Sequence, residues 1–299
     1  MRAIITGATG MIGIALTNEL LAHGYSCVAI IRENSKKRSL LPVDPNLTII
    51  ECSIEHFNEL EIEPNCDCFF HLAWEATTGQ SRDDVHLQEQ NIRYAIDSVG
   101  LAKRAGCETY VGVGSQAEYG IKSEMLSPIT SVDPMNGYGI AKYATSKLTR
   151  IYANQLSMKH CWGRILSIYG PNDNPNSLIS YLIKSFRSDL NVELTKCEQM
   201  WDYLYVKDCA RALRLIAEKG LNNKVYIIGS GEAQLLKEYV KIVKKEIKSN
   251  SKVLFGAKEY YPNQPMYLCA DIKELNADTG FVPKYTFEEG IKETIKYME

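Results

Sequence analysis

The segment that most constrains the fold is "RAIITGATGMIG", residues 2–13. An apolar run typical of a buried strand leads into a glycine-containing turn, and an apolar pattern with helical spacing follows. In such a unit the backbone can approach a pyrophosphate, and the helix N-terminus offers free N–H groups and a positive dipole end. The alternative is a glycine-rich turn without a ligand. The residues predicted to form a dinucleotide site here are Gly7, Thr9, Gly10, Met11, Ile12 and Gly13.

Strand-like and helix-like segments alternate along the first half of the chain. We expect strands at 2–6, 26–31, 47–50, 66–73, 109–114 and 163–169, and helices at 11–24, 83–105 and 137–159. This alternation predicts an α/β fold: a doubly wound parallel sheet of the Rossmann type, with a smaller C-terminal substrate lobe. The dinucleotide-binding domain is expected at 1–169 with a returning segment at about 202–230, and the lobe at 170–201 and 231–299.

The overall composition argues against several classes of protein. The 299 residues are 45% hydrophobic and carry a formal net charge of −2, so we expect no nucleic-acid or membrane surface. Nine cysteines lack the paired spacing of a zinc site, which predicts free thiols and no metal. The N-terminus enters a strand directly, without a signal sequence, and no run reaches the length of a membrane span. We therefore expect a cytoplasmic protein.

A serine, a tyrosine and a lysine form the candidate catalytic group. Ser115 follows an expected strand at its carboxyl end, the edge where open α/β sheets bind ligands. Tyr138 and Lys142 are four residues apart on an expected helix and share one face. A nearby ammonium lowers the pKa of a tyrosine and prepares it for proton transfer near neutral pH. A Tyr–Lys pair alone is common on helix surfaces, but the glycine turn and Ser115 together favour catalysis.

Several motifs occur in one order: "TGATGMIG", "HLA", "GSQAEYG", "YGIAK", "SIYGP" and "WDYLYVKD". In this order they resemble the extended short-chain dehydrogenase/reductases of the NAD-dependent epimerase/dehydratase family, which act on nucleotide sugars. The resemblance covers essentially the whole chain and implies that Ser115, Tyr138 and Lys142 are a catalytic triad. The segments "GSQAEYG" and "EQMWDYLYVKDCARAL" are most similar to reductases that make deoxysugars from 4-keto-6-deoxy sugar nucleotides. The 4-epimerases share the triad and are the main alternative.

The resemblance also implies contacts outside the triad. Leu72 and Ala73 match the segment that passes beneath the cofactor, and Asn91 matches an asparagine on the helix before the serine strand. Thr77 and Thr78 follow the fourth strand, where a substrate loop belongs. The predicted substrate-binding residues are Thr78, Asn91, Ser115, Gln116, Ser167 and Trp201, and the predicted adenine contacts are Ser53 and Ile54.

Some positions depart from the family pattern, and others are explained equally well by a structural role. Many relatives carry an arginine that meets the substrate diphosphate where this chain has Trp201, and asparagine is common in place of Ser167. A tryptophan there can stack on a base or sugar, or cover the interface of the lobe. His71 is expected to pack in the core. Glu118 either faces the sugar or is a solvated or hydrogen-bonded loop acid.

The stretch "AIIRENSKKR", residues 29–38, ends an expected strand in basic residues. A carboxylate at this strand end binds the adenosine ribose of NAD, whereas arginine or lysine accommodates the 2′-phosphate of NADP. Arg32 and Lys36 therefore favour NADP(H). NAD(H) is the alternative, because Glu33 meets ribose hydroxyls if the strand ends one residue later. The structural alternative is a solvated surface cluster.

Cofactor preference bears on the reaction. A reductase consumes NADPH in each turnover, whereas an epimerase returns the hydride and commonly keeps NAD. The basic cluster thus favours reduction of a 4-keto-(6-deoxy) sugar nucleotide by hydride transfer from NADPH. We expect Tyr138 to protonate the developing alkoxide, Lys142 to lower the Tyr138 pKa, and Ser115 to hydrogen-bond the oxygen. The alternatives are an NAD-dependent 4-epimerase and a non-catalytic NADP-binding regulator. Family members often pair as homodimers through helices corresponding to 83–105 and 137–159.

Overall fold

The centre of the molecule is a seven-stranded sheet in which all neighbouring strands run parallel. The structure is a computed structural model and describes residues 1–298. Across the sheet the strands are β11 (Lys224–Ile228), β6 (Lys159–Ile165), β5 (Thr109–Ser115), β4 (Cys68–His71), β1 (Arg2–Thr6), β2 (Ser26–Ile31) and β3 (Leu47–Glu51). The chain order reverses between β1 and β4, which confirms the doubly wound Rossmann-type fold.

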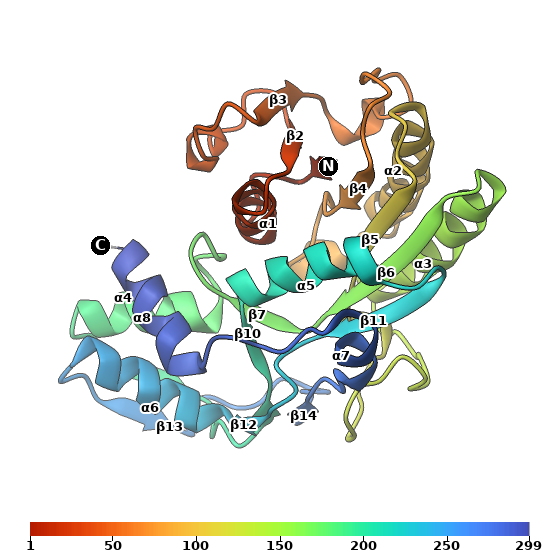
Figure 1. Ribbon diagram of the computed structural model, residues 1–299. Helices are drawn as coiled ribbons and strands as arrows, with labels where there is room; N and C mark the ends of the chain where they lie inside the picture. The colour runs from red at the N-terminus through yellow and green to blue at the C-terminus, as the bar shows by residue number, and fades with distance from the viewer. Residues whose placement is uncertain (299) are drawn as a thin grey trace.

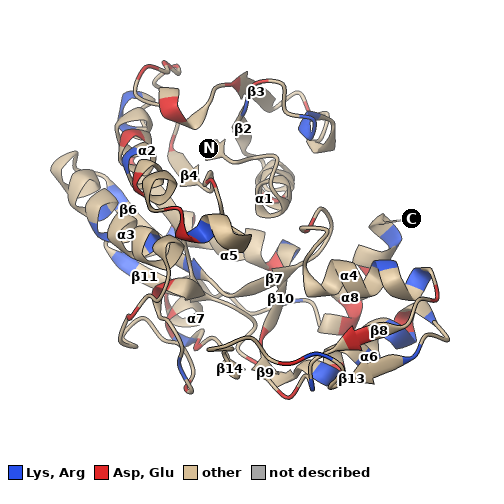
Figure 2. Cartoon of the chain, turned by 180° about the vertical axis from the view of Figure 1, so that it is seen from behind, with Lys and Arg blue, Asp and Glu red and all other residues tan. Residues whose placement is uncertain are grey.

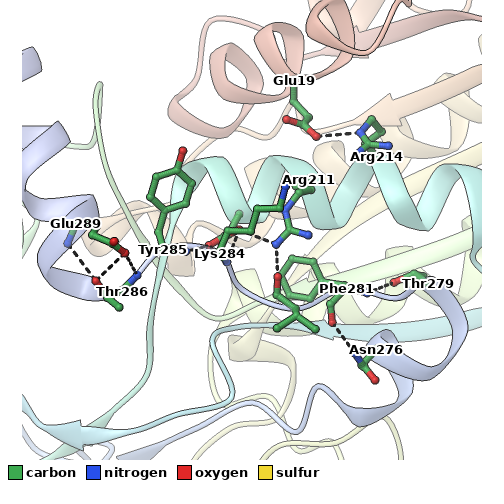
Figure 3. Close-up of polar contacts among 12 residues, drawn as sticks. Glu19, Arg211, Arg214, Asn276, Thr279, Phe281, Lys284, Tyr285, Thr286 and Glu289 are labelled. Carbon is green, nitrogen blue, oxygen red and sulfur yellow. Dashed lines mark hydrogen bonds and ion pairs between the residues drawn. The ribbon is translucent and has the colours of Figure 1, made fainter.

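Helices cover both faces of this sheet (Figure 1). On one face α1 (Met11–Ala22) packs against α5 (Val206–Lys219), and on the other α2 (Val85–Arg104) packs against α3 (Gly137–Gln155). Burial on both faces explains why the strands are continuous apolar runs. Arg214 of α5 donates to Glu19 of α1 over 2.9 Å, as Figure 3 shows, and this ion pair ties the two helices together.

The C-terminal elements form a smaller lobe at one end of the molecule (Figure 1). Its helices α4 (Leu178–Arg187), α6 (Leu236–Ile247) and α8 (Phe287–Tyr297) enclose a separate apolar cluster. The remaining strands form three small sheets: β7 (Ser167–Tyr169) with β10 (Tyr203–Tyr205); β9 (Met200–Trp201) with β12 (Gln234–Leu235) and β14 (Tyr267–Leu268); and β8 (Val192–Leu194) with β13 (Val253–Phe255).

Two elements differ from the sequence expectation. The strand expected at 163–169 is divided, because β7 leaves the main sheet to pair with β10. Helix α7 (Lys273–Thr279), expected in the lobe, packs against α5 and β11 instead. Asp278 holds it there by accepting hydrogen bonds from Lys224 (2.6 Å) and from Tyr226 (2.8 Å) of β11.

The junction of α5 with the C-terminal segment is held by buried polar contacts (Figure 3). Asp208 is fully buried and accepts hydrogen bonds from the backbone N–H groups of Lys284 and Tyr285. Arg211 binds the same carboxylate and also donates to the carbonyl of Val282. Within residues 1–298, no helix has both the length and the hydropathy needed to cross a membrane.

Two buried histidines predict a loss of stability in acid. Burial lowers the pKa of His71 and of His160 to about 3, whereas in the unfolded chain both bind a proton near pH 6.5. Because the folded pKa lies below the unfolded one, stability is lost as the pH falls from 6.5 toward 3, by about 2 kcal/mol for each histidine at pH 5. Urea unfolding at pH 7 and pH 5 measures this difference.

The variant His160→Phe tests the assignment. The imidazole lies in a stack between Tyr110 and Trp162, and its partner Thr149 also donates to the carbonyl of Thr145, so a phenyl ring is accommodated. In this variant we expect the difference in the free energy of unfolding between pH 7 and pH 5 to be smaller by the contribution of His160. An unchanged difference between pH 7 and pH 5 would contradict the buried, neutral state of His160.

Candidate functional site

The glycine turn lies at the carboxyl end of β1, beside the point where the strand order reverses. Gly7 has φ +66°, a conformation that favours glycine, and its carbonyl accepts the Gly10 N–H over 3.0 Å. A Cβ on Gly13 would lie 2.3 Å from the Gly7 carbonyl oxygen, so only glycine lets α1 pack this closely on the turn. Helix α1 begins without a side-chain cap or an acidic residue in its first turn. These features fit the pyrophosphate of a dinucleotide.

The segment after β4 lies against the same turn. The N–H groups of Leu72 and Ala73 both donate to the Thr6 hydroxyl over 3.2 Å. A Cβ on Gly7 would be 2.8 Å from the Ala73 nitrogen. Leu72 and Ala73 therefore border the space next to the glycine turn, as a segment beneath a cofactor would.

The basic loop follows β2 at the same edge of the sheet (Figure 2). Arg32 and Lys36 are exposed, whereas Arg38 pairs with Glu51 of β3 over 2.5 Å. The Cys52 N–H donates to the Ile31 carbonyl. This hydrogen bond keeps the ends of β2 and β3 together, so that Arg32, just after β2, lies near Ser53, shortly after β3. With Arg38 paired to Glu51, Arg32 and Lys36 stay the predicted phosphate contacts.

Ile54 is a core residue. Its side chain is 6% exposed and belongs to the apolar cluster beneath α2, together with Phe57 and Val99. The side chain of Ile54 thus contributes to the core, and the adenine contact of Ile54 stays a prediction.

The serine, the tyrosine and the lysine come together beyond β5. Ser115 is the last residue of β5 and its side chain hydrogen-bonds Tyr138. Tyr138 lies in the first turn of α3, where the Gly137 N–H donates to Asp83 over 2.8 Å. Lys142 is 3% exposed, and its Nζ donates to the carbonyl of Val113 over 2.8 Å.

The protonation states differ from the sequence expectation. Burial raises the pKa of Tyr138, although the Ser115 hydrogen bond and the Arg82 charge oppose it. Burial also lowers the pKa of Lys142 to about 7, and the charge of Glu118 opposes that shift. The ammonium of Lys142 is directed toward the Val113 carbonyl and lies 5.9 Å from the centre of the Tyr138 ring. Lys142 is thus not among the charges that shift the Tyr138 pKa, and its effect on Tyr138 in the presence of a bound cofactor stays a prediction.

Two residues that the sequence did not single out border this group. Trp74 follows the "HLA" motif, and Lys142 Nζ lies 3.7 Å above its ring centre. Its indole N–H donates to Gln88 over 3.0 Å, and its ring meets Tyr138 edge to face. The guanidinium of Arg82, from the loop after β4, lies 4.7 Å from the centre of the Tyr138 ring. In the sequence, Trp74 is marked only by its place just after the fourth strand, and Arg82 only by its place in the loop that follows.

The side chain of Asn91 bonds the loop that follows β4. It is fully buried, and its side-chain amide accepts the Glu75 N–H over 3.0 Å and donates to the Glu75 carbonyl over 3.1 Å. Asn91 thus fixes the loop that carries Trp74, and its substrate contact stays a prediction. Thr78 is exposed in this loop, and Gln116 is half-buried directly after Ser115.

The two departures from the family pattern contact each other. The indole N–H of Trp201 donates to the Ser167 hydroxyl over 2.8 Å. The Trp201 ring also packs against the cluster of the lobe and against a smaller cluster around Leu126 and Leu166. Of the two alternatives for Trp201, these contacts favour covering the interface of the lobe.

His71 and Glu118 both have structural partners. His71 is buried, and its Nδ1 lies 3.1 Å from the Thr6 hydroxyl oxygen, as expected of a core histidine. Glu118 is fully buried and paired with Arg164 over 2.7 Å, so it does not face a sugar.

The open parallel sheet and the glycine turn at its reversal point are the features of a dinucleotide-binding fold, and the Ser115–Tyr138–Lys142 group lies at the same edge of the sheet. The chain belongs to the NAD dependent epimerase/dehydratase family, whose model matches residues 3–229, and it is an NAD(P)-dependent enzyme.

Relatives with assigned activities match over the full length. The chain is 24% identical to the CDP-abequose synthase of Salmonella muenchen, covering 100% of this chain and 98% of that protein. It is 26% identical to the CDP-abequose synthase of Salmonella typhimurium, covering 99% and 97%. Among solved structures, the UDP-N-acetylglucosamine 4-epimerase of Methanobrevibacter ruminantium M1 has a TM-score of 0.89 at 23% identity, covering 99% and 97%. The UDP-glucose 4-epimerase of Thermotoga maritima has a TM-score of 0.86 at 23% identity, covering 100% and 98%.

Proposed function

We propose that the protein reduces a 4-keto-(6-deoxy) sugar nucleotide to a deoxysugar nucleotide with NADPH. The observation that carries the proposal is geometric: Tyr138, in the first turn of α3, lies beside Ser115 at the carboxyl end of β5. Reduction of a ketone needs a proton donor at the carbonyl oxygen, and a phenol that stays protonated at neutral pH is such a donor. The full-length similarity to two CDP-abequose synthases supports the same reaction class.

Each residue of the group has a chemical task in this proposal. When bound, the reduced nicotinamide supplies the hydride. Tyr138 donates its proton to the ketone oxygen, and Ser115 hydrogen-bonds that oxygen as negative charge develops. Lys142 contacts the Val113 carbonyl and the Trp74 ring and so fixes the surroundings of Tyr138. Residues 1–169 and about 202–230 would hold the cofactor, and most of 170–201 and 231–299 the sugar nucleotide.

The variant Arg32→Asp tests the cofactor preference. A charge-assisted hydrogen bond to the 2′-phosphate contributes about 1.5–3 kcal/mol, so we expect kcat/KM for NADPH to fall by about 10- to 100-fold. The value for NADH should stay the same or rise. Lys37→Asp is the matched control, because Lys37 is exposed on the same loop and the change in charge is equal. An unchanged NADPH/NADH ratio in Arg32→Asp would remove the argument for NADPH.

An NAD-dependent nucleotide-sugar 4-epimerase is the second candidate. The 24% identity over the full chain to the uncharacterized UDP-glucose epimerase YtcB of Bacillus subtilis favours it, as does Glu33 beside Arg32. An epimerase interconverts UDP-sugars without added cofactor, whereas a reductase oxidises NADPH only with a keto-sugar nucleotide. A panel of both substrate types, with NADPH and NADH in parallel, separates the two reactions. A non-catalytic NADP-binding regulator would turn over neither. Pairing of two copies through α2 and α3 stays a prediction.

A further inference from the structure

A buried carboxylate lies directly behind the candidate catalytic serine. Glu118 is fully buried at the end of a short 3-10 turn, η4 (Gln116–Glu118). Its Oε1 accepts the Ser115 backbone N–H and the Trp162 indole N–H, both over 3.0 Å. Its Oε2 accepts the Arg164 Nε–H over 2.7 Å. Since the Ser115 hydroxyl in turn accepts the Ala117 N–H, the serine is held from both its backbone and its side chain.

The surrounding residues accommodate this carboxylate closely. A Cβ on Gly114 would lie 2.1 Å from Glu118 Oε1 and 2.3 Å from Trp162 Nε1, so only glycine fits at this point of β5. Arg164 is 2% exposed and its guanidinium lies 4.5 Å from the centre of the Tyr119 ring. A buried ion pair often contributes no net stability because both charges lose their water. A buried pair without a net gain in stability points to a role in the chemistry of the site.

We propose that Glu118, paired with Arg164, is a positioning residue that holds Ser115 at the end of β5, and that its carboxylate is the negative charge that acts on Lys142. The inference deepens the proposed function and rests on it, because it assigns the group that prepares Ser115, Tyr138 and Lys142 for reduction.

The charges around Lys142 agree with this role. The Glu118 carboxylate raises the pKa of Lys142 and also that of Tyr138, so it favours the proton on both. His71 faces Lys142 from β4 but is neutral, since burial lowers its pKa to about 3. Arg82 faces Tyr138 from the loop after β4 and favours loss of its proton. Glu118 is thus the group that opposes the desolvation of Lys142.

The double variant Glu118→Gln with Arg164→Met removes both charges of the pair. The glutamine side chain keeps an oxygen for the N–H groups of Ser115 and Trp162, and methionine leaves no unpaired charge behind. Protonation of Lys142 is followed by tryptophan fluorescence between pH 5 and 10, because its Nζ lies over the Trp74 ring. The fluorescence titration of Lys142→Met is subtracted to remove the contribution of other groups.

The expected result is a midpoint near 7 in the unchanged protein and a lower midpoint in the double variant, because Glu118 raises the pKa of Lys142 and Arg164 is not among the charges that shift it. In turnover of a keto-sugar nucleotide, the high-pH limb of kcat should move down by a similar amount, since both Lys142 and Tyr138 lose protons more readily. If the fluorescence midpoint is unchanged in a double variant with native circular dichroism, the proposed action of the Glu118 charge on Lys142 is wrong.

The variant Glu118→Asp tests whether Glu118 positions Ser115. It also replaces the double variant as the test if that variant does not fold. It keeps the charge but shortens the reach to the Ser115 N–H, so we expect an unchanged fluorescence midpoint and an about tenfold lower kcat. A kcat equal to that of the unchanged protein would overturn the positioning of Ser115, and a lowered midpoint would overturn the role of the charge. The fluorescence titration needs no substrate, so failure of the proposed reaction would leave its result interpretable.

Discussion

Replacing Tyr138 by phenylalanine should lower kcat by about 10³-fold while the dissociation constant for NADPH stays within about twofold. The substitution removes one hydroxyl. The ring keeps its contacts with Trp74 and with the guanidinium of Arg82, so the local packing is retained. The proton donor that hydrogen-bonds Ser115 is lost. Steady-state NADPH oxidation measures kcat, and cofactor titration by fluorescence measures binding.

Tyr143→Phe is the matched control for this result. Tyr143 lies on the same helix α3, is half-buried, and its ring contacts Lys147 outside the Ser115–Tyr138–Lys142 group. It undergoes the same chemical change, so its kcat should equal that of the unchanged protein. A Tyr138→Phe enzyme with a kcat close to that of Tyr143→Phe would remove Tyr138 as the proton donor.

The second large effect is expected from Gly13→Ala. The added Cβ would lie 2.3 Å from the Gly7 carbonyl oxygen and 2.7 Å from the Cα of Ala8, and backbone atoms do not move aside at low cost. The turn and α1 must separate, which displaces the N–H groups of the helix N-terminus. We expect NADPH affinity to fall by about 100-fold, together with a lower Tm.

Gly100→Ala provides the control for a helical glycine. Gly100 lies within α2, and a Cβ there would have ordinary contacts of 3.5 Å with Tyr152 and 3.6 Å with Arg104. Alanine also has the higher helix propensity, so this variant should keep its NADPH affinity and lose no stability. If Gly13→Ala bound NADPH as tightly as Gly100→Ala, the glycine turn would not be the dinucleotide site.

The sequence predicts those features that depend on local pattern. The strand–glycine turn–helix unit at 2–22 and the alternation of strands and helices follow from hydrophobic periodicity and from glycine, and the structure confirms them. Ser115, Tyr138 and Lys142 come together because a strand end and the first turns of the following helix meet at one edge of the sheet.

Tertiary contacts decide what the sequence pattern cannot predict. Asn91 lies on the expected helix, but only the course of the loop after β4 shows that its amide is occupied by Glu75. The hydrogen bond between Trp201 and Ser167 joins residues 34 positions apart, and no periodicity relates them. The pKa of Tyr138 depends on its burial, which a sequence separation of four residues from Lys142 does not specify.

Tracing the transferred hydride with deuterium tests most directly whether the protein reduces a 4-keto-6-deoxy sugar nucleotide with NADPH. Reaction of the protein with a 4-keto-6-deoxy sugar nucleotide and NADPH deuterated at the transferable position of the nicotinamide should give a product sugar with one deuterium at the former ketone carbon. One NADP⁺ should form for each product molecule. Mass spectrometry and NMR of the product measure both quantities. A converted sugar without deuterium and with unchanged NADPH would contradict the account and would favour the epimerase.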